Sequence, residues 1–283
     1  MPAGTLITVA PTGAETAKSA APALPVSIDE LVSTAKSCEA EGAAMIHVHV
    51  RDTAAESTID VGRYREAVAA VRDTTDLVVQ VSTGGAVSDS EEARLAIVDC
   101  GPDAASLSLG TVNFGDDVFL NRWGFIVALY ERMQERAVVP EFECFDIGHL
   151  ATLTRLLDKH GAPPGGHVHV DLVCGVPGGM PGTAAAVAHA VTMLPVGATF
   201  SATGVGRTTL PVALAALAHG GHLRVGMEDT LSFAAGQPVR DNAQLVARAA
   251  ALATLAQRPP LSTADARSLL GIPARADDRA QRS

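Results

Sequence analysis

The chain has 283 residues, of which 47% are hydrophobic and 18% are charged, so it is long and apolar enough to bury one large core. This composition excludes a disordered tail and a small disulfide scaffold. With 21 Lys and Arg against 31 Asp and Glu, the net charge is −10 and no basic run occurs, which argues against nucleic-acid or membrane partners.

Short apolar, β-branched runs alternate with Ala-rich helical stretches along the whole chain. The runs lie at residues 6–9, 43–50, 77–81, 104–109, 139–145, 168–173, 198–201 and 223–227. Spacings of roughly 30 residues leave room for crossover helices between parallel strands. Such a series within one chain of this length predicts a closed (β/α)8 barrel, a TIM barrel, with a doubly wound open sheet as the alternative.

Two helix starts carry a capping signature, in which a serine precedes a glutamate by three residues. They are Ser27 with Glu30, and Ser88 with Glu91. We expect one barrel domain over residues 1–274 and a polar C-terminal tail over 275–283. No basic leader and no apolar stretch of about 20 residues occurs, so a cytoplasmic protein is expected. The scattered cysteines form no CxxC pair and are expected to be buried thiols.

Polar and Gly-rich segments follow the apolar runs, which places them at the C-terminal face of the barrel, where such folds carry their active sites. Within the second run, His47 and His49 are two residues apart and share one face of the strand. Two histidines and one glutamate are a common catalytic zinc set. Glu228, at the end of the eighth run with Arg224 on the same face, is the candidate third ligand.

Other motifs allow competing interpretations. His167 and His169 have the same spacing but begin the sixth run, at the opposite face, which favours a packing role. His149 follows the fifth run as either a substrate contact or a helix cap. The segment from Thr203 to Thr209 lacks the lysine of a P-loop, although its glycines and Arg207 fit a phosphorylated cofactor.

Together these motifs make the chain resemble the β-keto acid cleavage enzymes, the family of 3-keto-5-aminohexanoate cleavage enzyme. The resemblance is carried by seven segments in order, at residues 10–15, 47–52, 80–85, 112–116, 145–149, 175–179 and 220–229. It implies a zinc-dependent TIM barrel, usually a homotetramer, that converts a β-keto acid and acetyl-CoA into acetoacetate and a new acyl-CoA.

The resemblance also implies roles for individual residues. His47, His49 and Glu228 become the zinc ligands, in agreement with the strand parity above. Arg224 and Asp229 become the catalytic pair, and substrate contacts fall on Glu15, Ser82 and Gly85. The loop after the fourth strand departs from the family pattern, and Ser108 is chosen there as a further substrate contact.

Two questions stay open in the sequence. An amidohydrolase-like metal hydrolase would also use an HxH pair, with His149, His169 and Asp229, but it places HxH on the first strand, whereas residues 6–9 precede it here. Glu15, with Asp171 if it faces inward, favours a cationic β-keto acid, because an unpaired buried charge is costly. A neutral substrate remains the alternative, and a dianionic one is the least expected.

Overall fold

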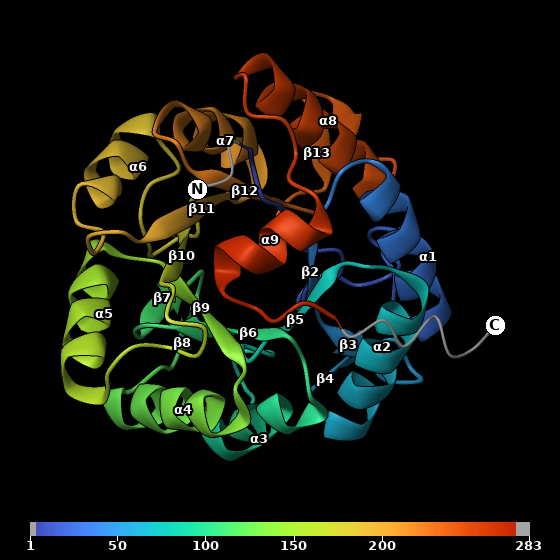
Figure 1. Cartoon of the computed structure of the whole chain (residues 1–283). Helices are drawn as coiled ribbons and strands as arrows, with labels where there is room; N and C mark the ends of the chain where they lie inside the picture. The colour runs from blue at the N-terminus through green and yellow to red at the C-terminus, as the bar shows by residue number, and fades with distance from the viewer. Residues whose placement is uncertain (1–3, 276–283) are drawn as a thin grey trace.

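The structure, a computed structural model, describes residues 4–275, and eight parallel strands in it close into a barrel (Figure 1). Around the barrel, neighbouring strands follow the order β1-β12-β11-β10-β9-β6-β5-β2. The barrel strands are β1 (Ile7–Val9), β2 (Met45–Val48), β5 (Val78–Val81), β6 (Ala104–Ser108), β9 (Val139–Cys144), β10 (His169–Cys174), β11 (Thr199–Gly204) and β12 (His222–Val225). The predicted TIM barrel is confirmed, and the open sheet is excluded.

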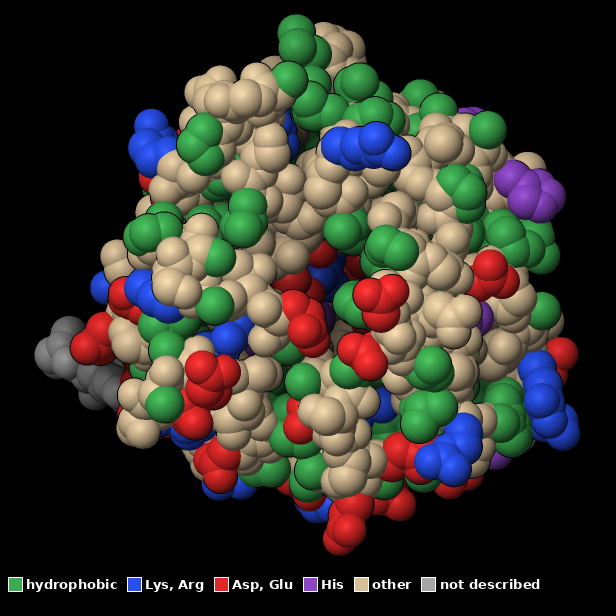
Figure 2. All heavy atoms as spheres, turned by 180° about the vertical axis from the view of Figure 1, so that it is seen from behind, with side chains coloured by type: hydrophobic (Ala, Val, Ile, Leu, Met, Phe, Trp, Pro, Cys, Tyr) green, Lys and Arg blue, Asp and Glu red, His purple; other side chains and the backbone are tan. Residues whose placement is uncertain are grey.

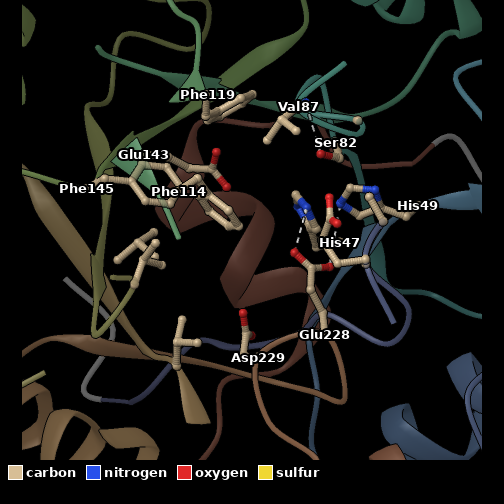
Figure 3. A pocket seen from close by; sticks show the side chains of 18 of the residues that line it. His47, His49, Ser82, Val87, Phe114, Phe119, Glu143, Phe145, Glu228 and Asp229 are labelled. Atoms are coloured by element: carbon tan, nitrogen blue, oxygen red, sulfur yellow. Dashed lines mark hydrogen bonds and ion pairs between the residues drawn. The ribbon is translucent and has the colours of Figure 1, made fainter. Parts of the chain in front are cut away.

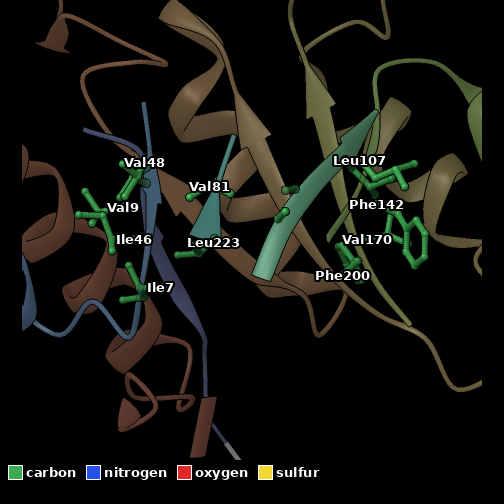
Figure 4. Packing of buried hydrophobic residues seen from close by; sticks show 14 of the residues in the cluster. Ile7, Val9, Ile46, Val48, Val81, Leu107, Phe142, Val170, Phe200 and Leu223 are labelled. Carbon is green, nitrogen blue, oxygen red and sulfur yellow. The ribbon is translucent and has the colours of Figure 1, made fainter. Parts of the chain in front are cut away.

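Helices surround the barrel and cover its outer face (Figure 1). They are α1 (Ile28–Ala40), α2 (Val61–Thr74), α3 (Glu91–Ala96), α4 (Trp123–Arg136), α5 (Ile147–His160), α6 (Ala184–Val191), α7 (Thr209–Ala218) and α8 (Asn242–Leu255). Outward-facing strand residues pack against them, and Figure 4 shows part of this core, including Ile46, Val48 and Leu223. No described helix is long and apolar enough to cross a membrane.

One further helix, α9 (Thr263–Leu270), lies across the N-terminal end of the barrel (Figure 1). Its Ala266, Leu269 and Leu270 form a second core cluster with Met45 and Val78, which begin barrel strands. This helix therefore closes the bottom of the barrel, and the opposite end stays open.

Three short hairpins follow barrel strands at the open end. They are β3 (Val50–Arg51) with β4 (Ser57–Thr58), β7 (Val112–Phe114) with β8 (Asp117–Phe119), and β13 (Ser232–Ala234) with β14 (Gln237–Pro238). Two 3-10 turns, η1 (Ile97–Cys100) and η2 (Gly206–Thr208), complete the described elements. Figure 2 shows this face hollowed at its centre, with acidic and basic side chains in the hollow.

The predicted helix starts have different outcomes. Ser27 accepts from the Glu30 N–H, and the Glu30 side chain accepts from the Ser27 N–H, so the capping box of α1 is confirmed. The Ser88 start is wrong, because Ser90 is the N-cap of α3 and its hydroxyl accepts from the Ala93 N–H.

Two further predictions concern the C-terminal tail, expected to begin at residue 275, and the cysteines, expected to be buried thiols. Arg275, assigned to the tail, donates to the carbonyls of Arg72, Thr75 and Leu77, and residues 276–283 lie outside the described residues. All the cysteines are buried free thiols, as expected.

Candidate active site

Two histidines and a glutamate meet at the open end of the barrel. His47 lies in β2, and His49 directly follows that strand. Glu228 lies in the turn that follows β12. In the barrel, β1 lies between β2 and β12. His47 Nε2 is 3.9 Å from Glu228 Oε1, and His49 Nε2 is 3.6 Å from Glu228 Oε2. One ligand atom from each of these side chains lies within 4.8 Å of the others (Figure 3). The predicted triad is therefore brought together, although Glu228 lies beyond the strand end at Val225.

The protonation of these side chains suits a metal ion. Burial, together with the nearby Arg224, lowers the pKa of His47 to about 3, and burial also lowers the pKa of His49, so both imidazoles are neutral. The Gln80 carbonyl oxygen lies 2.5 Å from His47 Nδ1 and can only accept, which assigns the proton to Nδ1 and leaves Nε2 bare. Glu228 Oε2 is buried and accepts no hydrogen bond from a described group. This donor set fits zinc, with room for a further ligand.

Arg224 lies beside the triad as a buried cation among carboxylates. Its guanidinium contacts Glu143 at 3.2 Å, Asp229 at 3.3 Å and Asp171 at 3.9 Å, and it also pairs with Glu228. Although burial opposes it, these carboxylates hold the pKa of Arg224 well above its ordinary value. Burial raises the pKa of Asp229 to about 7, against the opposing effect of Arg224. The predicted pair is thus in contact, and Asp229 has the pKa of a group that exchanges protons near neutrality.

Glu143 was missed from the sequence. It lies on β9, faces the barrel interior, accepts from the Ser108 hydroxyl at 2.9 Å and pairs with Arg224. The alternation of Glu141 and Glu143 with apolar neighbours in the fifth run was the available signal, because it places both carboxylates on the inner face.

A cavity of about 290 Å³ unites these groups at the mouth of the barrel. The predicted substrate contacts Glu15, Ser82 and Gly85 line it, and Glu15 is exposed at the surface. Gly85 has a φ of +62°, and a Cβ there would collide with Asp89, which explains the glycine. The predicted contact Ser108 does not line the cavity, because its hydroxyl lies behind Glu143.

Aromatic and aliphatic side chains form the other side of this cavity. We call them the apolar wall: Val87, Phe114, Phe119, Phe145, Val173, Val176 and Val205. Figure 3 shows Phe114, Phe119 and Phe145 grouped on one side and the two histidines with Glu228 on the other. The site therefore combines a polar, metal-binding half with an apolar half.

The other histidines considered as ligands or substrate contacts make hydrogen bonds within the protein. His169 bonds Thr199 and Ser201 inside the barrel, and His167 also bonds Thr199, which confirms their packing role. His149 Nδ1 accepts from the Phe145 N–H, a structural contact near the start of α5. Neither His149 nor His169 lies near the metal triad, and β1 precedes the HxH strand, so the amidohydrolase-like alternative is wrong.

The glycine loop after β11 is mostly bonded within the protein. The Val205 N–H donates to the Cys174 carbonyl and the Gly206 N–H donates to the Asp229 backbone carbonyl, which leaves few backbone donors for a phosphate. Asp171 faces inward, as the charge argument required, but both of its carboxylate oxygens lie within 2.9 Å of the Thr203 hydroxyl, which donates to them, and it does not line the cavity.

Comparisons with known proteins agree along the length of the chain. The family profile described as beta-keto acid cleavage enzyme matches residues 5–272. A 3-keto-5-aminohexanoate cleavage enzyme of Acetoanaerobium sticklandii is 36% identical over 94% of this chain and 98% of that protein. The 3-oxoadipate:acetyl-CoA acetyltransferase of Cupriavidus necator is 32% identical over 95% of each. The apo structure of ObcA has a TM-score of 0.73 at 20% identity, covering 89% of this chain and 66% of that one, which is a likeness of fold.

Proposed function

This chain belongs to the β-keto acid cleavage enzyme family, and from that membership we propose that it performs zinc-dependent acyl exchange between a β-keto acid and acetyl-CoA. The enzyme class and the acetyl-CoA co-substrate follow from the family and its relatives. The metal and the residue roles are our proposal. They are supported by one observation above all, the meeting of His47, His49 and Glu228 beside the Arg224–Asp229 pair in one cavity.

The proposed reaction exchanges two acyl groups. A proton leaves the carbon between the keto and carboxylate groups, and that carbon forms a bond to the carbonyl carbon of acetyl-CoA. The CoA thiolate released there adds to the original keto carbon, and the old carbon–carbon bond breaks. The carbon released as a carbanion takes back the proton removed in the first step. Acetoacetate and a new acyl-CoA are the products, so atoms and charge balance without a redox partner.

The residues divide this work. Asp229 accepts the proton, because its raised pKa makes it a usable base near neutral pH. Arg224 holds the carboxylates around it and stabilises negative charge that develops on the substrate. Zinc, when held by His47, His49 and Glu228, supplies a Lewis acid that polarises the keto oxygen. Ser82 and Gly85 contact the substrate beside the histidines, and Glu15 contacts it at the mouth.

Metal content tests the proposed centre directly. Purified protein should carry about one zinc per chain. The changes His47→Ala, His49→Ala and Glu228→Gln should each lower zinc content by elemental analysis and abolish acyl-CoA formation. His167→Ala is the matched control, because it removes a partly buried histidine away from the centre and should keep both. Full zinc in all three site variants, or its loss in the control alone, contradicts this centre.

Oligomeric state and location stay predictions. A homotetramer is consistent with exposed apolar side chains on and near α6 and α7, namely Met193, Val196, Leu210 and Leu214. Their burial between copies would remove apolar surface from water. A cytoplasmic location rests on the sequence argument alone.

A further inference from the structure

One part of the cavity carries none of the groups that the proposed reaction uses. Figure 3 shows His47, His49 and Glu228 on one side of the cavity and Phe114, Phe119 and Phe145 on the other, with the Glu143 carboxylate beside these rings. The wall draws on the loops or ends of five barrel strands, β5, β6, β9, β10 and β11. The wall therefore belongs to the architecture of the site and does not come from one local segment.

The aromatic part of the wall is held in place. Rings of Phe114, Phe119 and Phe145 contact one another edge to face, with centroids 6.2–6.3 Å apart and interplanar angles of 67–75°. The hairpin β7–β8 that supplies two of them is fixed to the loop after β10, where the Gly115 N–H donates to the Pro177 carbonyl at 3.0 Å. The wall is therefore preformed, as small-molecule pockets generally are.

A positive charge lies behind this wall. The Arg94 guanidinium is 4.7 Å from the Phe119 ring centroid and 4.4 Å from that of Phe125. It is buried, and its hydrogen bonds go to the carbonyls of Thr83 and Leu120 and to the Asn121 side chain, all neutral groups. Burial lowers the pKa of Arg94 to about 10, so it stays charged at neutral pH. Arg94 would repel a cationic substituent against Phe119, and the nearby carboxylates of Glu143, Glu91 and Asp89 offset part of that repulsion.

The acidic groups of the cavity are already committed. Glu143, Glu228 and Asp229 all pair with Arg224, and Glu143 does so from beside the phenylalanine rings (Figure 3). Glu15 is exposed at the mouth, where water screens its charge. No carboxylate among the described residues belongs to the apolar wall, and no hydrogen-bond donor side chain does either. A carboxylate would lose its hydration there without a partner. An ammonium group would find only aromatic ring faces, and Arg94 already lies over the Phe119 ring.

We propose that the natural β-keto acid carries a short, uncharged aliphatic or aromatic substituent on its keto carbon, which binds the apolar wall. This inference rests on the proposed function and names its substrate class. Family membership leaves the substituent open, because the names of the two relatives above specify an amino group in one case and a second carboxylate in the other. The cavity, about 290 Å³, lies at the small end of ligand pockets, which sets the substituent as short.

The test compares kcat/KM, with acetyl-CoA as co-substrate, for β-keto acids of matched length ending in alkyl, phenyl, ammonium, trimethylammonium or carboxylate groups. The alkyl or phenyl substrate should exceed every charged one by about tenfold or more. Along the alkyl series, kcat/KM should rise about fourfold per added methylene until the wall is filled. A preference for either cation, or for the carboxylate, overturns the substrate class while leaving β-keto acid cleavage intact. Acyl-CoA formed from none of them overturns the proposed function as well.

Variants of the hairpin β7–β8 test whether the apolar wall causes the preference for an alkyl substrate. Phe114→Glu should raise KM for the alkyl substrate about tenfold and narrow its advantage over the ammonium substrate, whereas Phe114→Leu should retain that advantage. The matched control is Val118→Glu, which adds the same charge to the exposed face of the same hairpin and should leave both substrates unaffected. An alkyl advantage over the ammonium substrate that is as large in Phe114→Glu as in wild type, or that disappears in Glu15→Gln, contradicts selection by the wall.

Discussion

Arg224 sets the charge of the site. Its guanidinium is buried among four carboxylates, those of Glu143, Asp171, Glu228 and Asp229. Removal of one partner of such a buried group costs about 3–5 kcal/mol, because the remaining charges lose their compensation. Arg224→Ala therefore tests folding together with catalysis, and Asp229 is the better position at which to test proton transfer.

Asp229→Asn should keep the fold and the zinc and lower kcat by about 100-fold or more, since the amide retains the shape but cannot accept the proton. Steady-state kinetics, zinc analysis and thermal unfolding would be measured on the same preparation. Asp117→Asn, an exposed change on the hairpin β7–β8, is the control and should match wild type. A near wild-type rate in Asp229→Asn would remove this residue as the base.

The pH dependence of the reaction follows from the same carboxyl group. Because burial raises the pKa of Asp229 to about 7, the base becomes protonated as pH falls, and kcat/KM should fall with it. A bound divalent cation favours the ionised form, so the midpoint of this fall in the zinc enzyme should lie at or below pH 7. A pH–rate profile of wild type that shows no acid limb, or one with its midpoint well above 7, would contradict the assignment.

Some residues of the candidate active site could be predicted from the sequence, and others could not. The two-residue spacing of His47 and His49 predicted a shared face directly, because it depends on one strand only. Gln80 and Glu143, which hold His47 and Arg224, could not be assigned because their roles depend on contacts between strands far apart in the chain. The family resemblance supplied Asp229, and its raised pKa emerged only once its burial was known.

At the scale of elements, the capping box of α1 is a local signal that the fold preserves. Hydrogen bonds from Lys18 and from the N–H groups of Val26 and Ser27 lower the pKa of Glu30 to about 2, against the opposing effect of partial burial. A carboxyl with a depressed pKa stabilises the fold above its ordinary pKa of 4.5, and this contribution is lost as pH falls towards 2.

Substitution of the cap should therefore weaken the protein measurably. Ser27→Ala should lower the free energy of unfolding by about 1 kcal/mol, because the Glu30 N–H loses its acceptor. In Glu30→Gln the deficit relative to wild type should be present at neutral pH and shrink as pH approaches 2. Urea unfolding at several pH values measures both. A deficit in Glu30→Gln that grows on acidification would contradict this account of the cap.

Other elements escaped sequence analysis for physical reasons. Ser88 and Ser90 each offer a capping hydroxyl, and the Asp89 carboxylate accepts from the Ala86 N–H, which fixes a turn before Ser90. The hairpin β7–β8 was not predicted, since its strands are only three residues each. Helix α9 packs on the ends of strands from across the barrel, so its position depended on the closed fold.

At the scale of the whole molecule, the barrel has an apolar outside and a polar inside. Outward residues such as Ile46 and Val170 meet the helices, whereas His47, Gln80, Glu141 and other polar side chains fill the interior. The alternation of strands and helices predicted this architecture because it is repeated along the chain. The apolar wall was not predicted, because it gathers one or two residues from each of five loops or strand ends.

The fate of the acetyl group tests the central claim, that this fold exchanges acyl groups between a β-keto acid and acetyl-CoA. The enzyme would be incubated with unlabelled alkyl β-keto acid and acetyl-CoA carrying carbon-13 in its acetyl group, and both products would be analysed by mass spectrometry. The account predicts label in the methyl and keto carbons of acetoacetate and an unlabelled acyl-CoA built from the β-keto acid. Unlabelled acetoacetate, or free carboxylic acid in place of the new acyl-CoA, would contradict it.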